Sequence, residues 1–232
     1  LDGWRKAAVG GEVTLRTGQS MVQVDAGNGS ATTEYMGGAM ALAAMLRVPL
    51  RGVPGLRIGI GAEGGTLPLH TVLNPDTQEA EAWVKLDHAD LGNDEANEDF
   101  WYKYQYVYYG QLNGRVDLQF GQAPVGIFAE GSVGLQVNHG QVHHFIYDLD
   151  EQGNKINNTG RLRRDPSDEF SWGGLQTGFG AGLWVEAPKW PVTIALGYRF
   201  LSGNMEQLST MERIFNTQME RELLALDVGY RF

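Results

Sequence analysis

The sequence predicts an all-β fold: a closed, antiparallel, up-and-down transmembrane β-barrel of eight strands, with residues 1–232 as a single domain. Three observations support this prediction. Eight segments alternate apolar with polar or small residues at period two, as strands with one apolar face do. Short and long connections alternate between these segments. The last segment is apolar on one face and ends on two aromatic residues of that face, Tyr230 and Phe232.

Composition agrees with this fold class and argues against others. The 232 residues include 32 glycines and no cysteine, so no disulfide or thiolate metal site is available. The net charge of -10 argues against a nucleic-acid partner, because nucleic acids select basic surfaces. The mean hydropathy of -0.28 suits a barrel in which every second strand residue faces a polar interior. The sequence starts at Leu1 without a signal-like segment, so we expect that a secretory signal has been removed.

The first four predicted strands cover residues 9–24, 36–50, 56–66 and 100–120. Residues 51–55 form a tight turn between the second and third, because proline and glycine there supply the required backbone angles. Residues 25–34 and 72–98 are predicted loops, the second strongly acidic.

Asn113-Gly114 is a possible hairpin turn inside the fourth predicted strand. We favour one continuous strand, because the alternation runs through this dipeptide unbroken. Residues 115–120 alone are also shorter than the roughly 9–11 residues that cross a bilayer.

The last four predicted strands cover residues 127–138, 170–187, 192–200 and 223–232. Residues 121–124 and 188–191 are short turns, whereas residues 147–168 and 202–218 are predicted loops, the second with a helical turn around residues 211–215. All short connections therefore lie at one end of the predicted barrel and the long polar ones at the other. An even strand count places both termini at the short-turn end.

On this architecture and on the terminal Tyr230-Arg231-Phe232, the chain resembles the small eight-stranded outer-membrane barrels of Gram-negative bacteria. That class includes the transmembrane domain of OmpA and the OmpW-like and OmpX-like proteins. The resemblance implies a location in the bacterial outer membrane with both termini in the periplasm. It implies outer-membrane lipid, lipopolysaccharide and the outer-membrane assembly machinery as partners. It also implies that the terminal strand carries the assembly signal, on Leu226, Val228, Tyr230 and Phe232.

The inward strand faces carry charges of both signs. An eight-stranded barrel is only wide enough for side chains to fill it, and buried charges persist when they are paired. We therefore expect a salt-bridged plug that is densest at the short-turn end. The alternative is a narrow channel for small solutes or ions, gated by exchange of ion-pair partners. The predicted lumen network consists of Glu12, Arg16, Arg47, Arg57, Glu63, Lys103, Arg115, Asp117, Glu130, Glu186, Arg199, Asp227 and Arg231.

Histidines near the predicted outer rim are the candidates for catalysis. His139, His143 and His144 fall at the end of the fifth strand, and His88 lies in the acidic loop; a histidine held by a carboxylate acts as a general base. The sequence offers no nucleophile of evident geometry beside them. We therefore expect no catalytic residue, and an outer-membrane enzyme acting on lipid A or peptides remains the alternative.

One acidic stretch resembles the opening of a calcium loop. It reads Asp148-x-Asp150-x-Gln152-Gly153, but its twelfth position is Thr159 rather than glutamate, so the EF-hand pattern fails. We expect a polar turn, with Asp148 and Asp150 as weak metal candidates and no cofactor.

The predicted function is that of a structural or interaction protein: a membrane anchor whose extracellular loops contact a partner, such as another envelope protein. Tyrosines at positions 102, 104, 106 and 108 and the terminal aromatic residues fit interfacial girdles. A soluble lipocalin-like barrel would need the opposite alternation, with the apolar face enclosing a ligand.

Overall fold

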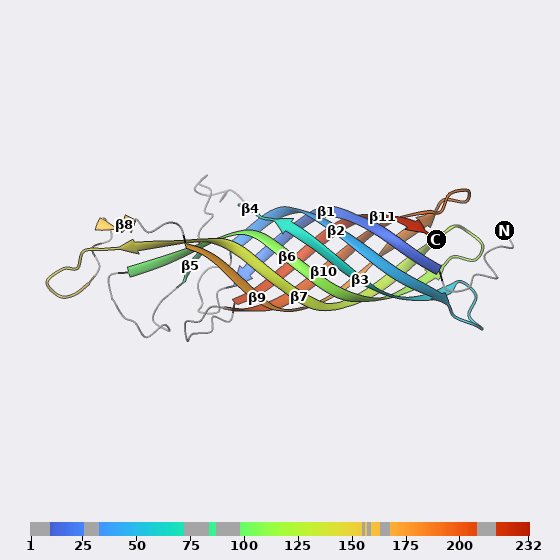
Figure 1. Ribbon diagram of the computed structural model, residues 1–232, viewed down its shortest axis with the longest axis horizontal. Coiled ribbons are helices and arrows are strands. Elements are labelled where there is room, and N and C mark those ends of the chain that lie inside the picture. Colours follow the sequence, from blue (N-terminus) through green and yellow to red (C-terminus); the bar gives the residue numbers. More distant parts are fainter. Residues whose placement is uncertain are drawn as a thin grey trace.

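Eight long strands form a closed antiparallel ring in the computed structural model (Figure 1). Each long strand pairs with the next along the chain, and β1 pairs with β11 to close the ring. The predicted fold class is confirmed. The strands are β1 (Gly10–Asp25), β2 (Thr33–Pro49), β3 (Leu56–Pro68), β6 (Glu98–Gln119), β7 (Val125–Ile146), β9 (Asp168–Glu186), β10 (Val192–Gln207) and β11 (Thr217–Arg231).

The structure describes residues 10–25, 33–71, 84–86, 98–154, 156, 159–162, 168–207 and 217–232, with backbone only at some strand ends toward the long loops. Within these ranges, no helix is long and apolar enough to cross a membrane.

The strands are strongly tilted, as their register shows. A path of Cα partners that starts at Glu12 and crosses each strand pair in turn returns to β1 at Val22, ten residues further along. With a strand spacing of about 4.8 Å and a rise of about 3.3 Å per residue, this offset gives a tilt of about 40° from the barrel axis. Inward side chains from distant parts of the sequence therefore meet at the same height.

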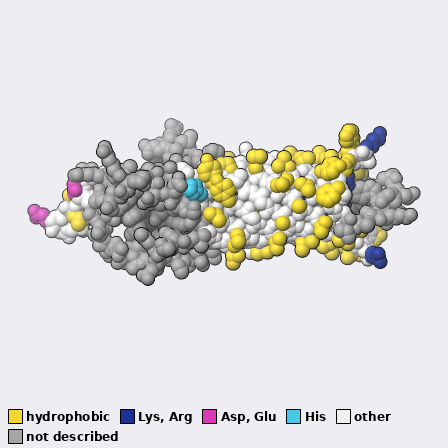
Figure 2. All heavy atoms as spheres, in the orientation of Figure 1, with side chains coloured by type: hydrophobic (Ala, Val, Ile, Leu, Met, Phe, Trp, Pro, Cys, Tyr) yellow, Lys and Arg dark blue, Asp and Glu magenta, His cyan; other side chains and the backbone are white. Residues whose placement is uncertain are grey.

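The period-two alternation assigns each long strand an outer and an inner face. Leu42 and Ile60 on the outer face are 60% and 67% exposed, while Ala41 and Glu63, on the inner face of the same two strands, are buried. Figure 2 shows hydrophobic side chains along the visible side of the barrel. The outside is therefore the apolar surface, and the polar side chains are enclosed.

Three short strands add to the eight long ones, and two of them lie within predicted loops. These strands are β4 (His70–Thr71), β5 (Val84–Leu86) and β8 (Arg161–Leu162), which pair with β2, β6 and β7. The prediction of loops throughout 72–98 and 147–168 is thus wrong at β5 and β8. The prediction for 202–218 is wrong at both ends, because β10 continues to Gln207 and β11 begins at Thr217. Backbone pairing extends these strands where side chains give no apolar alternation. The helical turn predicted at 211–215 falls outside the described residues.

The longest strands, β6 and β7, pair along almost their whole length. Asn113 and Gly114 lie opposite Ser132 and Gly131 in the middle of this ladder, so the prediction of one continuous strand is confirmed. The register shifts once, between Tyr104 and Tyr106.

The short connections and the paired ends of β1 and β11 lie at one end of the barrel (Figure 1). Backbone hydrogen bonds join them: the Gln119 N–H donates to the Gly55 carbonyl (2.9 Å) and the Arg231 N–H donates to the Pro191 carbonyl (2.8 Å). Gly52 and Gly55 turn the chain at positive φ, 95° and 83°, which favours glycine. This end is called the short-turn end below, and the opposite one the long-loop end.

Candidate functional site

The enclosed charged side chains are the candidate functional site. Seven arginines and six carboxylates from all eight long strands project into the lumen of the described barrel, and the sequence placed all but Arg221 there. The side chain of Lys103, the remaining predicted member, lies outside the described part of the chain. The thirteen residues are Glu12, Arg16, Arg47, Arg57, Glu63, Arg115, Asp117, Glu130, Glu186, Arg199, Arg221, Asp227 and Arg231.

The central cluster consists of Arg16, Glu63, Glu130, Arg199 and Asp227, one residue from each of five strands. Arg16 donates through Nε and Nη2 to the two carboxylate oxygens of Asp227, at 2.9 and 3.2 Å, and forms an ion pair with Glu63. Its Nη2 lies 3.5 Å from Glu130. Arg199 pairs with Glu130 and donates to Asp227 Oδ2 at 2.9 Å. Three carboxylates thus share two guanidinium groups in the middle of the lumen.

Glu63 also links the central cluster to neutral side chains. Its carboxylate accepts hydrogen bonds from the Tyr109 hydroxyl (3.0 Å) and from Asn113 Nδ2 (2.9 Å). These donors satisfy oxygen lone pairs that Arg16 does not reach. A buried carboxylate needs such bonds to offset its lost hydration.

A second group of charges fills the short-turn end. Arg47 donates to Glu12 at 2.7 Å and lies 3.5 Å from Asp117, which in turn accepts from Arg115 Nε at 2.8 Å. Glu186 joins Arg57 at 2.7 Å and Arg231 at 3.0 Å. The last two arginines are the more exposed members, with side chains 14% and 20% accessible at the mouth.

Two inward aromatic rings support these arginines. The Arg115 guanidinium lies 3.9 Å from the centre of the Phe128 ring, and that of Arg57 lies 4.6 Å from the Trp184 ring. Trp184 is fully buried and donates from Nε1 to the Ile127 carbonyl at 3.0 Å. Cation–π contacts of this kind strengthen when water is excluded. The rings and the ion pairs together occupy the lumen at the short-turn end.

Arg221 is the lumen charge that sequence reasoning missed, because the last strand was predicted to start at residue 223. Every second residue of that strand points inward, and extending this alternation toward the N-terminus from Leu223 reaches Arg221 and Met219. This alternation is the signal that would have identified Arg221. Arg221 bonds to Gln176 and lies 5.2 Å from the centre of the Tyr109 ring. Gln176 in turn donates to Gln111 at 2.9 Å.

Apolar side chains occupy the next inward positions toward the long-loop end. In the direction of the long-loop end, Met219 is the next inward residue after Arg221 on β11, and Val107 is the next after Tyr109 on β6. Val22 of β1 lies opposite Arg221. All three side chains are fully buried. The lumen is therefore layered, with ion pairs at the short-turn end and in the centre and an amide-rich layer around Arg221 above them. The layer beyond it is largely apolar but also contains the buried side chain of Asn138, whose Cα is paired with that of Val107.

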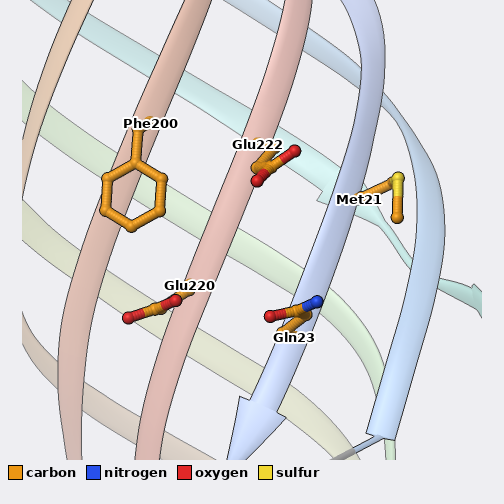
Figure 3. A pocket seen from close by; sticks show the side chains of 5 residues that line it. All are labelled: Met21, Gln23, Phe200, Glu220 and Glu222. Atoms are coloured by element: carbon orange, nitrogen blue, oxygen red, sulfur yellow. The ribbon is translucent and has the colours of Figure 1, made fainter.

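Polar residues interrupt the outer face near the long-loop end of β11. Glu220 and Glu222 point outward beside Met21 and Gln23 of β1 and Phe200 of β10 (Figure 3). They line a shallow groove of about 60 Å³. Carboxylates are costly in hydrocarbon but not at headgroup level, so this groove marks an upper limit of the apolar band on this side.

The stretch that resembles a calcium loop uses its acidic oxygens within its own turn. Asp150 Oδ1 accepts from the backbone N–H groups of Gln152 (2.9 Å) and Asn154 (2.7 Å), and the Asn154 side chain donates to both carboxylate oxygens. The bonds from Asn154, with smaller contributions from Gln152 and Gly153, hold the pKa of Asp150 below its usual range. The Asp148 N–H donates to Thr159 Oγ1 at 2.9 Å. Within the described residues, no group of three or more metal-ligating side chains comes together.

The other candidate residues lie at the two ends of the barrel. His139 lies on β7 opposite Tyr106; His143 and His144 follow on the same strand with side chains outside the described part, and His88 lies outside it entirely. The members of the proposed assembly signal, Leu226, Val228, Tyr230 and Phe232, are exposed on the outer face at the short-turn end. The backbone of Phe232 pairs with that of Gly11.

No protein-family model and no curated protein matches the chain. Among solved structures, the chain is similar to Neisserial surface protein A, at 10% identity and a TM-score of 0.44 over 95% of this chain and 97% of that one. It is similar to the attachment invasion locus protein Ail of Yersinia pestis in complex with sucrose octasulfate, at 13% identity and a TM-score of 0.39 over 96% and 99%. It is also similar to the outer membrane protease OmpT of Escherichia coli, at 10% identity and a TM-score of 0.40 over 97% and 96%. At these identities the likeness concerns the fold alone.

Proposed function

We propose that the chain is an integral protein of the bacterial outer membrane with an occluded lumen, acting as a structural or interaction protein through its long-loop end. The distribution of side chains supports a membrane location. The outward residues of β2 are apolar from Met40 to Val48, and most of those of the other long strands continue the band, while the charges at the same height are enclosed. This is the inverse of a soluble barrel and suits strands that face lipid.

The asymmetry of the connections supports the proposed orientation. Tight turns and the paired ends of β1 and β11 share one end, as in outer-membrane barrels whose short turns face the periplasm. Trp190 and Tyr230 are exposed at this end, where aromatic side chains anchor a barrel at the lipid headgroups. In this orientation the long-loop end faces the outside of the cell.

The single observation that carries the proposed role is the central cluster. Its five charged side chains, each at most 9% exposed, reach across the lumen from five strands. An ion that passes would have to separate these pairs, and separating a buried pair costs about 3–5 kcal/mol. A barrel closed in this way contributes a rigid anchor for its loops rather than a path for solutes.

Planar-bilayer recordings test the occlusion. The wild-type protein should show no steady conductance, whereas Arg16→Gln combined with Asp227→Asn should introduce open events by removing the shared contacts of the cluster. Glu222→Gln changes a carboxylate on the outer face of the same strand as Asp227 and should leave the recordings unchanged. A reproducible wild-type open state that disappears on changing Arg115 or Glu130 would instead establish a gated channel.

A gated channel is the second candidate, and one observation favours it. Arg16 contacts three carboxylates and Arg199 contacts two, so either guanidinium has an alternative partner within the cluster. Exchange between partners could open a path without leaving a charge unpaired. The bilayer recordings above distinguish this function from the occluded anchor.

Site-specific photo-cross-linking in native membranes tests the interaction role. Leu149 is 43% exposed in the turn at the long-loop end, and Val53 is 44% exposed in the turn between β2 and β3 at the short-turn end. A photoreactive amino acid at position 149 should capture an envelope partner or lipopolysaccharide that the probe at position 53 does not. Identical adducts at both positions, or none at position 149, would contradict the proposed role.

A further inference from the structure

Arg221 differs from the other six arginines in the lumen. Arg16, Arg47, Arg57, Arg115, Arg199 and Arg231 each form an ion pair with a carboxylate. Among the described residues, Arg221 has no carboxylate at ion-pairing distance; its contacts are the Gln176 amide and the Tyr109 ring. It is 2% exposed, so hydration from bulk water does not stabilise its charge.

A second buried polar side chain in the lumen also has unpaired atoms. Gln136 is 1% exposed, and neither its amide nitrogen nor its amide oxygen has a hydrogen-bond partner. Arg221 Nε is likewise without a partner. Buried polar groups are almost always satisfied, so the two unpaired donors, Gln136 Nε2 and Arg221 Nε, point to a ligand within the lumen.

The glycine at position 203 relates the positions of the two side chains. A Cβ at this position would lie 2.6 Å from Gln136 Nε2, so the Gln136 amide reaches across β9 and rests against the bare backbone of β10. Gly203 is paired with Gln176, the residue that Arg221 binds. On its other side, Gly203 is paired with Met219 of β11, the next inward residue after Arg221 toward the long-loop end. The Gln136 amide and the Gln176 side chain that binds Arg221 therefore lie at the same part of β10.

We propose that Arg221 and Gln136 form a binding site for one small monovalent anion, such as a halide or a compact carboxylate. A guanidinium supplies the charge and two types of N–H group supply directed hydrogen bonds, which together favour an anion over a neutral solute. The Gln176 amide holds Arg221 in place, because its own donor is engaged by Gln111.

The layers on either side determine access to this site. Toward the long-loop end, the fully buried side chains of Val22, Val107 and Met219 take the next inward positions. Toward the short-turn end, the central cluster carries an excess of one carboxylate over its two arginines, which repels an anion. The anion is thus a resident of the folded barrel that exchanges slowly, rather than a permeating ion.

Refolding in bromide tests this site directly. The full-length protein is refolded in detergent with bromide as the sole halide and crystallised, and anomalous scattering is measured at the bromine edge. We expect a peak between Arg221 and Gln136 in the wild-type protein and none in Arg221→Gln. Gly203→Ala, whose methyl group displaces the Gln136 amide, should weaken the peak and provides a second variant if Arg221→Gln does not fold. Absence of the wild-type peak, with water in its place, would overturn the proposal.

Thermal unfolding gives an independent measurement in solution. As bromide replaces gluconate at constant ionic strength during refolding, the midpoint of the heat-induced gel-mobility change should rise and then saturate, because the ligand binds only the folded state. The matched control is Arg57→Gln, which removes a paired arginine at the opposite end of the lumen and should keep the saturable rise. Equal bromide responses in the wild type and Arg221→Gln would show that the effect does not come from this site.

Discussion

Replacement of Asp227 by alanine should strongly destabilise the barrel, although it leaves the apolar outer face intact. Asp227 is 3% exposed and accepts three hydrogen bonds, two from Arg16 and one from Arg199. Removing one partner of a buried ion pair costs about 3–5 kcal/mol. Arg16 keeps Glu63 and Arg199 keeps Glu130, so we expect about 3 kcal/mol, the lower end of this range. That corresponds to roughly a hundredfold change in the unfolding equilibrium.

Urea unfolding in lipid vesicles, followed by tryptophan fluorescence, measures this loss, and the heat-induced gel-mobility midpoint provides a second readout. Asp227→Asn keeps the shape and part of the hydrogen bonding and should fall between the wild type and Asp227→Ala. Glu222→Ala removes an outward carboxylate from the same strand and should change stability by no more than about 0.5 kcal/mol. If Asp227→Ala unfolds at the same urea concentration as Glu222→Ala, Asp227 does not hold the cluster together.

The remaining predictions concern four other positions. Arg16→Gln should lower the free energy of unfolding by about 5 kcal/mol, more than Asp227→Ala, because it leaves three carboxylates facing one arginine. Low pH protonates carboxylates, so urea unfolding at low pH should show a smaller difference in stability from the wild type. Trp184→Ala should cost about 4 kcal/mol in the same assay by leaving a cavity beneath Arg57, and Trp184→Phe should cost less. The Asp150 carboxylate, whose pKa is lowered, should protonate below the pH at which it does in an unstructured peptide. The turn is thus held by the ionised form above that ordinary pH and loosens as the pH falls through the lowered pKa, which NMR shifts of the Asn154 amide should report in the wild type but not in Asp150→Asn. Phe232→Ala should lower the yield of folded barrel in cellular outer membranes while leaving refolding into detergent unchanged, as fractionation and gel mobility would show.

The faces of the strands could be predicted from the sequence because they depend on a local rule. Successive side chains point to opposite sides of a strand, so Leu15 and Arg16 must lie on opposite faces wherever that strand is placed. The interior location of the predicted charges followed from this rule. The partners of those charges did not, because they depend on the ten-residue offset of the ring, which no single strand specifies.

Features outside the apolar band were harder to predict. The segment Gln218 to Glu222 is polar on both faces apart from Met219, so its alternation carries no signal of burial, and Arg221 was missed for this reason. The short strands β5 and β8 form by backbone pairing with the extended ends of β6 and β7. The Gln136 amide lies against Gly203 because the side chain extends across the intervening strand β9. The spacing of residues in the sequence does not reveal such a contact.

The contact between Arg16 and Asp227 joins residues 211 positions apart, on the first and last strands of the ring. If the strands pair in chain order during folding, Arg16 contacts Asp227 only after β11 has paired with β1. A partly built sheet therefore holds charges that have lost water without gaining their counterions, which makes every open intermediate unfavourable. Closure is the step at which this cost is removed, so folding should be cooperative, with few partially closed barrels at equilibrium. Such a barrel would also resist opening along its seam once inserted, because the first strand to leave would expose the same charges again.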